Sequence, residues 1–436
     1  MSAADATTAV ILLDVALVVT AAGLFAGIAR RLGQPPVIGE IVAGIALGPS
    51  LLGLLPGDLT ETLFPVAERP ILAVLGNVGL VLFMFVVGYE VDLGHLRKTR
   101  AAVATAAASS LLLPLAAGVG AGFLLYPMHR DEVADGVGQT AFVLFTGVAL
   151  AITAFPVLAR ILTDFKLQRG RLGSFTMTCA AVTDVVAWAL LTVVVLLAVG
   201  GSWPDMALRA GGLLLFVASL ALVIRPPLLD KTLGAFAGRR ATGAPLLLIL
   251  VGLLLSAWVT TRLGFHPIFG AFAFGAAMPR DAVRAAAPEA PLLIEQTGKL
   301  FLPVFFVTTG LSVDVTGIGL AGLGQLVLVM VIACGAKFLG AAGGARLAGM
   351  DKRRSAAFGV LMNCRGLTEL VVIQAGVSAG VLDQQLTTIM IVMAVITTAM
   401  TAPLFRRIYD EELRREDAAV HNVPTRSPAA VPVEGS

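Results

Sequence analysis

Residues 174–199 read SFTMTCAAVTDVVAWALLTVVVLLAV, a run of 26 mostly apolar residues that contains one carboxylate, Asp184. A helix of about 20 apolar residues crosses the hydrocarbon core of a bilayer, so this stretch predicts a transmembrane helix. Asp184 lies ten residues into the run. At the helical rise per residue this is about 15 Å, near the middle of the membrane. Ionisable groups at that depth are costly and are usually functional.

The whole chain has the composition of a protein whose solvent is largely lipid. Of its 436 residues, 57% are hydrophobic and 14% are charged, whereas soluble domains carry about 25% charged residues. The mean hydropathy is +0.91, and the net charge of +3 suggests no nucleic-acid partner. Cys179, Cys334 and Cys364 lie in apolar segments without CxxC spacing, so neither disulfides nor zinc sites are expected.

Thirteen apolar segments predict an all-α polytopic membrane protein. The first lacks the basic flank of a signal peptide and is interpreted as a retained span. The transmembrane domain is expected over residues 1–405. A largely disordered cytoplasmic tail is expected at 406–436, which is polar and contains three prolines. The expected spans are roughly 8–29, 36–55, 71–89, 101–126, 139–159, 174–199, 208–224, 244–261, 266–278, 292–312, 319–347, 355–380 and 386–404.

Basic residues gather in alternate loops between these spans. With the N-terminus placed outside, the loops expected in the cytoplasm and the tail together hold 24 Lys and Arg residues, and the opposite loops hold four. Cytoplasmic loops are enriched in Lys and Arg. The distribution therefore predicts an odd number of spans in the plasma membrane, with the N-terminus outside and the C-terminus in the cytoplasm.

Two spans contain residues that disfavour a continuous helix. The fifth reads AITAFP at 151–156, and the twelfth carries NCRG at 363–366. Pro156 removes a backbone donor and clashes with the preceding turn. Because the two spans are seven apart, they run in opposite directions, as in an inverted repeat. Broken spans in corresponding positions of two halves indicate a transporter site, although a kinked span can also bind nothing.

Charged residues inside other spans indicate how such a site would work. Lys337 lies near the middle of the eleventh span, and we expect it to form an ion pair with Asp184 whose protons are shared in a coupled titration. A cation or a proton that takes the carboxylate would release Lys337, which is the minimum that an antiporter requires. The alternative is a structural salt bridge that holds two helices together.

A second opposite pair, Arg365 and Glu369, lies four residues apart in the twelfth span. We expect it to compensate charge, and neutralisation of the ends of the broken helix is the structural alternative. Hard cations favour oxygen ligands. The hydroxyls of Thr153 and Thr183, together with backbone carbonyls freed by the interruptions, are therefore the expected partners of a monovalent cation at Asp184.

Seven segments, in this order, resemble the monovalent cation:proton antiporter-2 family. The resemblance is to its bacterial sodium/hydrogen exchangers and to the membrane part of plant cation/proton exchangers. The segments are PPVIGEIVAGIALGPSLLG at 35–53, LFMFVVGYEVDL at 82–93, ALAITAFPVLARIL at 149–162, AAVTDVVAW at 180–188, GFHPIFGAFAFGAAMP at 264–279, LPVFFVTTGLSVDV at 302–315 and LMNCRGLTELVV at 361–372.

This resemblance implies a homodimer whose protomers each have a dimerisation subdomain and a mobile core subdomain. It implies that the interrupted helices cross, at Thr153–Pro156 and at Asn363–Gly366. The family's essential aspartate maps onto Asp184, and its basic core residue onto Lys337. Relatives usually place Asp or Asn before the essential aspartate, where this chain has Thr183. A single acid is associated with electroneutral exchange.

The sequence thus predicts a secondary transporter that exchanges Na⁺ or K⁺ for H⁺, one for one, by alternating access. Two alternatives stay open: a potassium-efflux system controlled by a separate subunit, and an exporter of an organic or ionophore-bound substrate on the same fold. No HExxH or Walker A pattern occurs in the sequence, and no enzymatic activity is expected. The expected partners are the ions, the bilayer and a second copy of the chain, and no cofactor is expected.

Overall fold

The computed structural model describes residues 3–57, 59–90, 100–134, 136–165, 167, 170–198, 203–222, 229–236 and 243–409, in which every regular element is helical. Most of the tail expected at 406–436 lies outside the described residues. The elements are α1 (Ala3–Arg31), α2 (Pro36–Leu47), η1 (Leu52–Leu54), α3 (Leu59–Leu63), α4 (Arg69–Glu90), α5 (Arg100–His129), α6 (Gln139–Ala151), α7 (Phe155–Asp164), α8 (Arg171–Ala198), α9 (Trp203–Ser219), α10 (Asp230–Gly234), α11 (Gly243–Arg262), α12 (Pro267–Ala277), α13 (Arg280–Ala286), α14 (Ala290–Leu311), η4 (Thr316–Ile318), α15 (Gly319–Leu347), α16 (Lys352–Met362), α17 (Leu367–Ser378) and α18 (Gln384–Ile408).

Length and hydropathy make most of these helices membrane-spanning elements. In the described part of the chain, eight helical stretches are long and apolar enough to cross a membrane. Four shorter apolar helices add to them, namely Gln139–Ala151, Ala207–Leu222, Pro267–Ala277 and Thr368–Ser378. The all-helical membrane fold predicted from the sequence is therefore confirmed, whereas the predicted number of thirteen spans stays a prediction.

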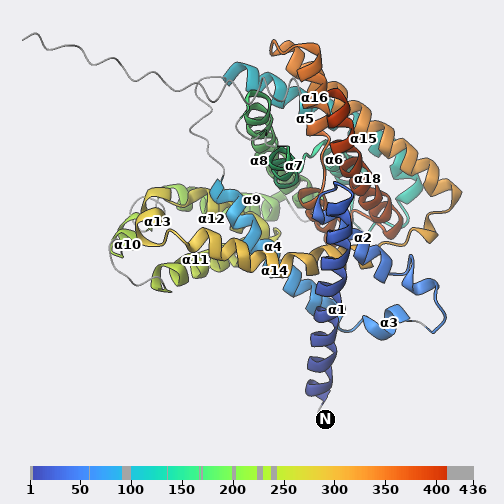
Figure 1. Ribbon diagram of the computed structural model, residues 1–436, viewed down its shortest axis with the longest axis horizontal. Helices are drawn as coiled ribbons and strands as arrows, with labels where there is room; N and C mark the ends of the chain where they lie inside the picture. The colour runs from blue at the N-terminus through green and yellow to red at the C-terminus, as the bar shows by residue number, and fades with distance from the viewer. Residues whose placement is uncertain are drawn as a thin grey trace, which may run out of the picture.

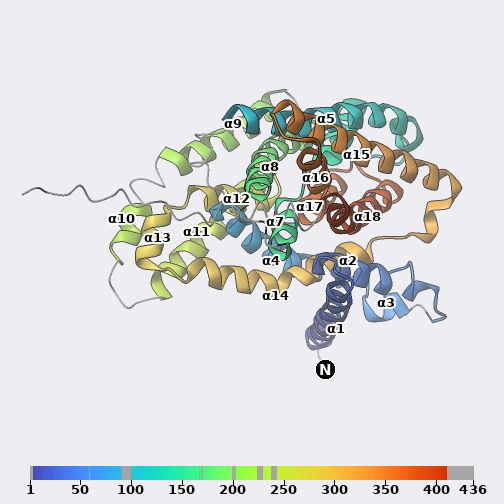
Figure 2. The same cartoon turned by 45° about the horizontal axis from the view of Figure 1, so that its top comes forward.

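The helices form two groups. One contains α1, α2, α4, α11, α12 and α14, and the other contains α5 to α8 and α15 to α18. Figure 1 shows α11, α12 and α14 on one side of the molecule and α5, α15 and α16 on the other. The turned view keeps α5 and α15 side by side (Figure 2). Each group consists of helices that are widely separated in the sequence.

Small residues allow neighbouring helices in both groups to approach closely. A Cβ atom on Gly44 of α2 would lie 2.3 Å from the carbonyl oxygen of Val307 in α14. A Cβ atom on Gly340 of α15 would lie 2.6 Å from the carbonyl oxygen of Ser109 in α5. Gly23 of α1 differs, because nothing lies within 4 Å of its Cβ position. The GxxxG spacing of Gly23 and Gly27 in the sequence therefore does not mark a helix contact within this chain.

Candidate functional site

Two membrane helices are interrupted where the sequence predicts. Helix α6 ends at Ala151, residues 152–154 are not helical, and α7 begins at Phe155. Helix α16 ends at Met362, residues 363–366 are not helical, and α17 begins at Leu367. Pro156 is the second residue of α7, and proline is well tolerated in the first turn of a helix because its missing donor has no partner there.

The two interrupted helices run in opposite directions. The N-terminal ends of α8 and α16 line a common cavity, through Arg171 and Asp351, so α7 ends on the side where α16 begins. On the other side, the N–H of Ala134, before α6, donates to the carbonyl oxygen of Gly380, after α17, at 3.0 Å. The antiparallel arrangement that the span order predicts is therefore present.

The two non-helical segments contact each other directly. The N–H of Ala154 donates to the carbonyl oxygen of Cys364 at 2.9 Å. The hydroxyl of Thr153 donates to the carbonyl oxygen of Met362, the last residue of α16, at 2.8 Å. Gly366 has φ 153°, and a Cβ atom there would lie 2.7 Å from Cγ2 of Val157. The interrupted helices thus cross at their breaks, and Gly366 is required by both its backbone conformation and its close neighbour.

Asp184 lies on α8 beside this crossing. Its side chain is almost fully buried, and its Oδ1 has no hydrogen-bond partner among the described residues. The N–H of Phe155, the first residue of α7, donates to the carboxylate. The N-terminus of a helix carries a partial positive charge, so α7 faces Asp184 with the end that favours a carboxylate. One oxygen remains available for another ligand.

Lys337 of α15 is fully buried, and its Nζ donates to the carbonyl oxygens of Ser110, at 3.1 Å, and Ala151. This differs from the direct ion pair with Asp184 that we expected. Ala151 is the last residue of α6, where unpaired carbonyls carry the negative end of the helix dipole. Lys337 therefore compensates the negative end of the α6 dipole. Its positive charge also acts on the carboxylate of Asp184 without direct contact.

Arg365, which lies in the break between α16 and α17, also binds the C-terminal end of α6. Its guanidinium donates to the carbonyl oxygens of Ala149, at 2.9 Å, and Leu150, at 2.6 Å. It also donates to Glu369 Oε2 at 2.9 Å, and both side chains are fully buried. The last three carbonyls of α6 thus receive hydrogen bonds from two cationic side chains. Both cations stabilise a helix end that would otherwise be unsatisfied in the membrane.

The remaining predicted site residues differ in what they offer a cation. The hydroxyl of Thr183 donates to the carbonyl oxygen of Ala180 at 3.0 Å, so its oxygen keeps lone pairs. Asn363 was predicted only as a residue of the broken helix. Its Nδ2 faces Cys334 Sγ at 3.6 Å, whereas its buried Oδ1 has no partner among the described residues. Asn363 is therefore a further candidate oxygen ligand that the sequence did not single out.

Thr398 of α18 is a supporting residue that the sequence analysis missed. Its hydroxyl accepts a hydrogen bond from the N–H of Arg365 at 3.1 Å and donates to the carbonyl oxygen of the same residue at 2.5 Å. Both polar groups of this non-helical residue are thereby satisfied. No sequence signal distinguishes Thr398 from the other threonines of its span, because only the crossing brings it to Arg365.

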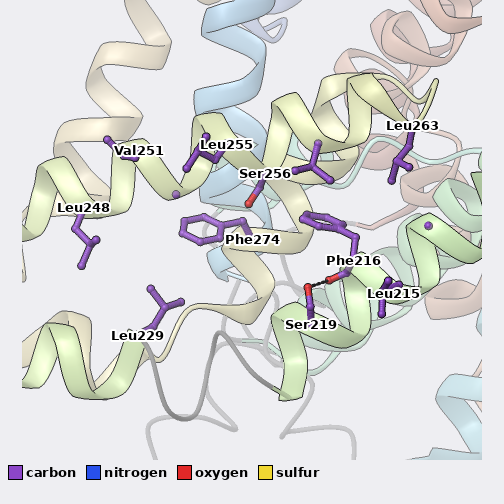
Figure 3. A pocket seen from close by; sticks show the side chains of 13 residues that line it. Leu215, Phe216, Ser219, Leu229, Leu248, Val251, Leu255, Ser256, Leu263 and Phe274 are labelled. Atoms are coloured by element: carbon purple, nitrogen blue, oxygen red, sulfur yellow. Dashed lines mark hydrogen bonds between the residues drawn. The ribbon is translucent and has the colours of Figure 1, made fainter.

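A cavity with both polar and apolar lining residues lies between the two groups of helices. Its volume is about 340 Å³, and it is lined by side chains of α4, α14 and α17, among them Asn77, Thr308 and Gln374. A larger groove of about 710 Å³ lies between α9, α11 and α12 (Figure 3). That groove is lined mainly by Leu, Val and Phe side chains, with Ser219 and Ser256 and no ionisable group, so it offers no carboxylate to a cation.

Antiparallel interrupted helices that cross beside a buried carboxylate are an arrangement typical of secondary transporters. The family model of the transmembrane sodium/hydrogen exchangers matches residues 16–407. The chain belongs to this family, which confirms the resemblance to cation:proton antiporters.

Individual relatives agree with this assignment. The Na(+)/H(+) antiporter NhaS4 of Synechocystis is 35% identical over 414 residues, which cover 92% of this chain and 98% of that protein. Cation/H(+) antiporter 17 of Arabidopsis thaliana is 38% identical over 413 residues, which cover 92% of this chain and 48% of that protein. The chain thus spans about half the length of its plant relatives.

A solved structure has the same fold. The sodium proton antiporter MjNhaP1 from Methanocaldococcus jannaschii matches with a TM-score of 0.62 and 16% identity, over 94% of this chain and 99% of that one. At this identity the match concerns the fold alone.

Proposed function

We propose that this protein exchanges a monovalent cation, Na⁺ or K⁺, for H⁺ across the membrane by alternating access. The observation that carries the proposal is Asp184, a buried carboxylate with an unpartnered oxygen at the crossing of two interrupted helices. A proton and a cation compete for that carboxylate, so the protein carries one or the other. The printed names of relatives, Na(+)/H(+) antiporter and cation/H(+) antiporter, support the same activity.

The charges around Asp184 favour exchange of one cation for one proton. Asp184 and Glu369 are balanced by Lys337 and Arg365, and all four side chains are buried. With these groups ionised, the site is neutral when empty and carries one positive charge with either H⁺ or Na⁺ on Asp184. Both loaded forms then have the same charge, and one cycle moves no net charge.

Oxygen atoms at the crossing would complete the coordination of a cation. Asn363 Oδ1 has no partner among the described residues, and Thr153 and Thr183 each keep lone pairs on their hydroxyl oxygens. Hard cations bind such oxygens. This set does not by itself separate Na⁺ from K⁺, so both belong to the proposal.

The setting of the protein is part of the proposal. The distribution of basic residues supports an external N-terminus, a cytoplasmic C-terminus and a position in the plasma membrane. Exposed leucines on α1 and α11, such as Leu12, Leu24 and Leu255, form apolar surface that a second copy of the chain can cover in a homodimer. No feature of the described residues favours the potassium-efflux or organic-exporter alternative.

Exchange by purified protein in liposomes tests the proposal. An internal pH dye reports the collapse of an imposed pH gradient when Na⁺, K⁺ or Li⁺ is added. We expect a response to at least one cation, and we expect Asp184→Asn to abolish it. Asp14→Asn is the matched control, because Asp14 is also fully buried but lies on α1, away from the crossing, and it should retain exchange.

Two results would contradict the mechanism. One is an Asp184→Asn variant that folds and exchanges as the wild type does. The other is a sustained current during exchange, measured on a solid-supported membrane, because equal charges on the two loaded forms allow none.

A further inference from the structure

A second cluster of ionisable side chains lies at the far end of the α5–α8 and α15–α18 group. His129 is the last residue of α5, and Asp383 precedes α18. Both side chains are buried, and His129 Nδ1 contacts Asp383 Oδ2. Glu132 lies exposed one turn after His129, with its N–H bonded to the carbonyl oxygen of His129 at 3.0 Å. The transport mechanism uses none of these three residues.

The three side chains could hold one metal ion together. Their ligand atoms, a ring nitrogen and two carboxylate oxygens, all lie within 4.8 Å of one another. Zn²⁺ binds His nitrogen and carboxylate oxygen at about 2.0–2.2 Å, which places neighbouring ligands about 3.3 Å apart in a tetrahedron. The exposed Glu132 side chain can move inward to reach that spacing, and the fourth position is left to water.

The far side of the imidazole ring supports this role. His129 Nε2 lies 3.2 Å from Gln325 Oε1 of α15, and Gln325 Nε2 in turn lies 3.4 Å from Met128 Sδ. A metal-binding histidine nearly always gives its second ring N–H to an oxygen acceptor, which fixes the tautomer and the ring orientation. Gln325 holds the ring so that Nδ1 faces the carboxylate of Asp383. A metal ion at Nδ1 would take the place of the proton that is shared with Asp383.

Asp383 can bind a metal ion without giving up its structural role. Its Oδ1 accepts the N–H of Leu386 at 2.7 Å and so caps the N-terminus of α18. Its Oδ2 is the oxygen that faces His129. The two oxygens thus have separate functions, and the capping bond is independent of the ligand at Oδ2.

We propose that His129, Glu132 and Asp383 form a binding site for a divalent transition-metal ion such as Zn²⁺. Imidazole and carboxylate ligands together suit this class of ion. The site joins the end of α5 to the start of α18, next to the hydrogen bond between Ala134 and Gly380 that links the outer ends of the interrupted helices. It is separate from the crossing at Asp184.

The experiment measures metal binding and does not depend on exchange. Purified protein, with any affinity tag removed, is titrated with Zn²⁺ by calorimetry and with Co²⁺ by visible absorption. We expect one site per chain and a Co²⁺ spectrum of low coordination number. Glu132→Gln and Asp383→Asn should each weaken binding at least tenfold, and Asp383→Asn keeps the amide oxygen that caps α18. Gln325→Leu should weaken binding about 10–100-fold, as losses behind a ligating histidine do.

Asp131→Asn is the matched control, since Asp131 is an exposed neighbouring carboxylate whose recorded partner is Arg130. It should bind Zn²⁺ as the wild type does. The proposal is overturned if the wild type binds no Zn²⁺, or if Glu132→Gln and Asp383→Asn bind as tightly as the wild type. Binding that is lost equally in Asp131→Asn would also overturn it, because the ion would then be held by general surface charge.

Discussion

At the scale of single residues, the crossing of the interrupted helices contains both polar groups that have hydrogen-bond partners and buried polar groups that have none. Arg365 gives hydrogen bonds to three partners, the carbonyls of Ala149 and Leu150 and the carboxylate of Glu369. In contrast, Asp184 Oδ1, Asn363 Oδ1 and Glu369 Oε1 are buried without partners among the described residues. Buried polar groups are nearly always paired, so the unpaired oxygens of Asp184 and Asn363 support the ion site proposed above. The unpaired Glu369 Oε1 and Arg365 Nε belong to the buried ion pair.

The buried pair of Arg365 and Glu369 gives an asymmetric prediction. Arg365→Met leaves a buried carboxylate and two helix-end carbonyls without donors, so we expect it to lower the free energy of unfolding by about 3–5 kcal/mol. Glu369→Gln keeps an acceptor near Arg365, whose other two partners remain, and should cost clearly less. Thermal unfolding followed by tryptophan fluorescence measures both.

An exposed cation serves as the control for this pair. Lys352→Met, at the start of α16, should leave the unfolding temperature nearly unchanged because Lys352 is exposed. Equal losses in Arg365→Met and Glu369→Gln would show that the carbonyl contacts of Arg365 contribute little.

At the scale of elements, the sequence predicted the interruptions but not how they are held together. Pro156 and the polar segment Asn363–Gly366 are local signals, so both breaks could be placed from the sequence. The residues that cap the C-terminal end of α6 could not be predicted from the sequence, because Lys337 donates to a carbonyl oxygen 186 residues away in the chain. The direct ion pair expected between Lys337 and Asp184 does not form, because Lys337 instead donates to the carbonyl oxygen at the end of α6. This competing acceptor cannot be recognised from the charges in the sequence. The GxxxG spacing of Gly23 and Gly27 likewise does not predict a contact within the chain, since packing depends on what lies opposite a glycine.

Close packing of α2 on α14 gives the prediction at this scale. Gly44→Ala places a Cβ atom 2.3 Å from the carbonyl oxygen of Val307, and the backbone of α14 must move to accommodate it. Such overpacking costs about 1–3 kcal/mol, which should appear as a lower unfolding temperature. Gly23→Ala is the matched control, since its Cβ meets nothing within 4 Å, and it should be neutral or stabilising by up to about 1 kcal/mol. The same loss in both variants would show that the α2–α14 contact does not set the effect.

At the scale of the whole molecule, two groups of helices meet along a surface that contains the cavity of about 340 Å³. The cavity is shared, because α4 and α14 belong to one group and α17 to the other. Relative movement of the groups would therefore close it. The cavity lies toward the side where α4 begins and α14 ends, which is the predicted extracellular side.

Accessibility of a single cysteine tests this movement. Gln374→Cys, in a chain whose half-buried Cys334 is replaced by serine, should react with a membrane-impermeant thiol reagent added from outside. Cys179 and Cys364 are buried and should not react. When the ion site faces the cytoplasm and binds its ion from that side, the cavity is expected to be closed. Labelling of Gln374→Cys should then be several-fold slower. Labelling at one rate under every gradient would contradict a movement that closes this cavity.

The capped end of α6 also determines which sequence changes the protein can tolerate. Lys337 and Arg365 contact the backbone oxygens of residues 149–151 and not their side chains. These three residues, Ala149, Leu150 and Ala151, present the same backbone oxygens whatever their side chains are, but the side chains are fully buried. Changes there therefore act through core packing, whereas changes at positions 337 and 365 remove the hydrogen bonds themselves. Half of the charge-balancing arrangement is thus made by the backbone, and a search for polar side chains would find only the other half.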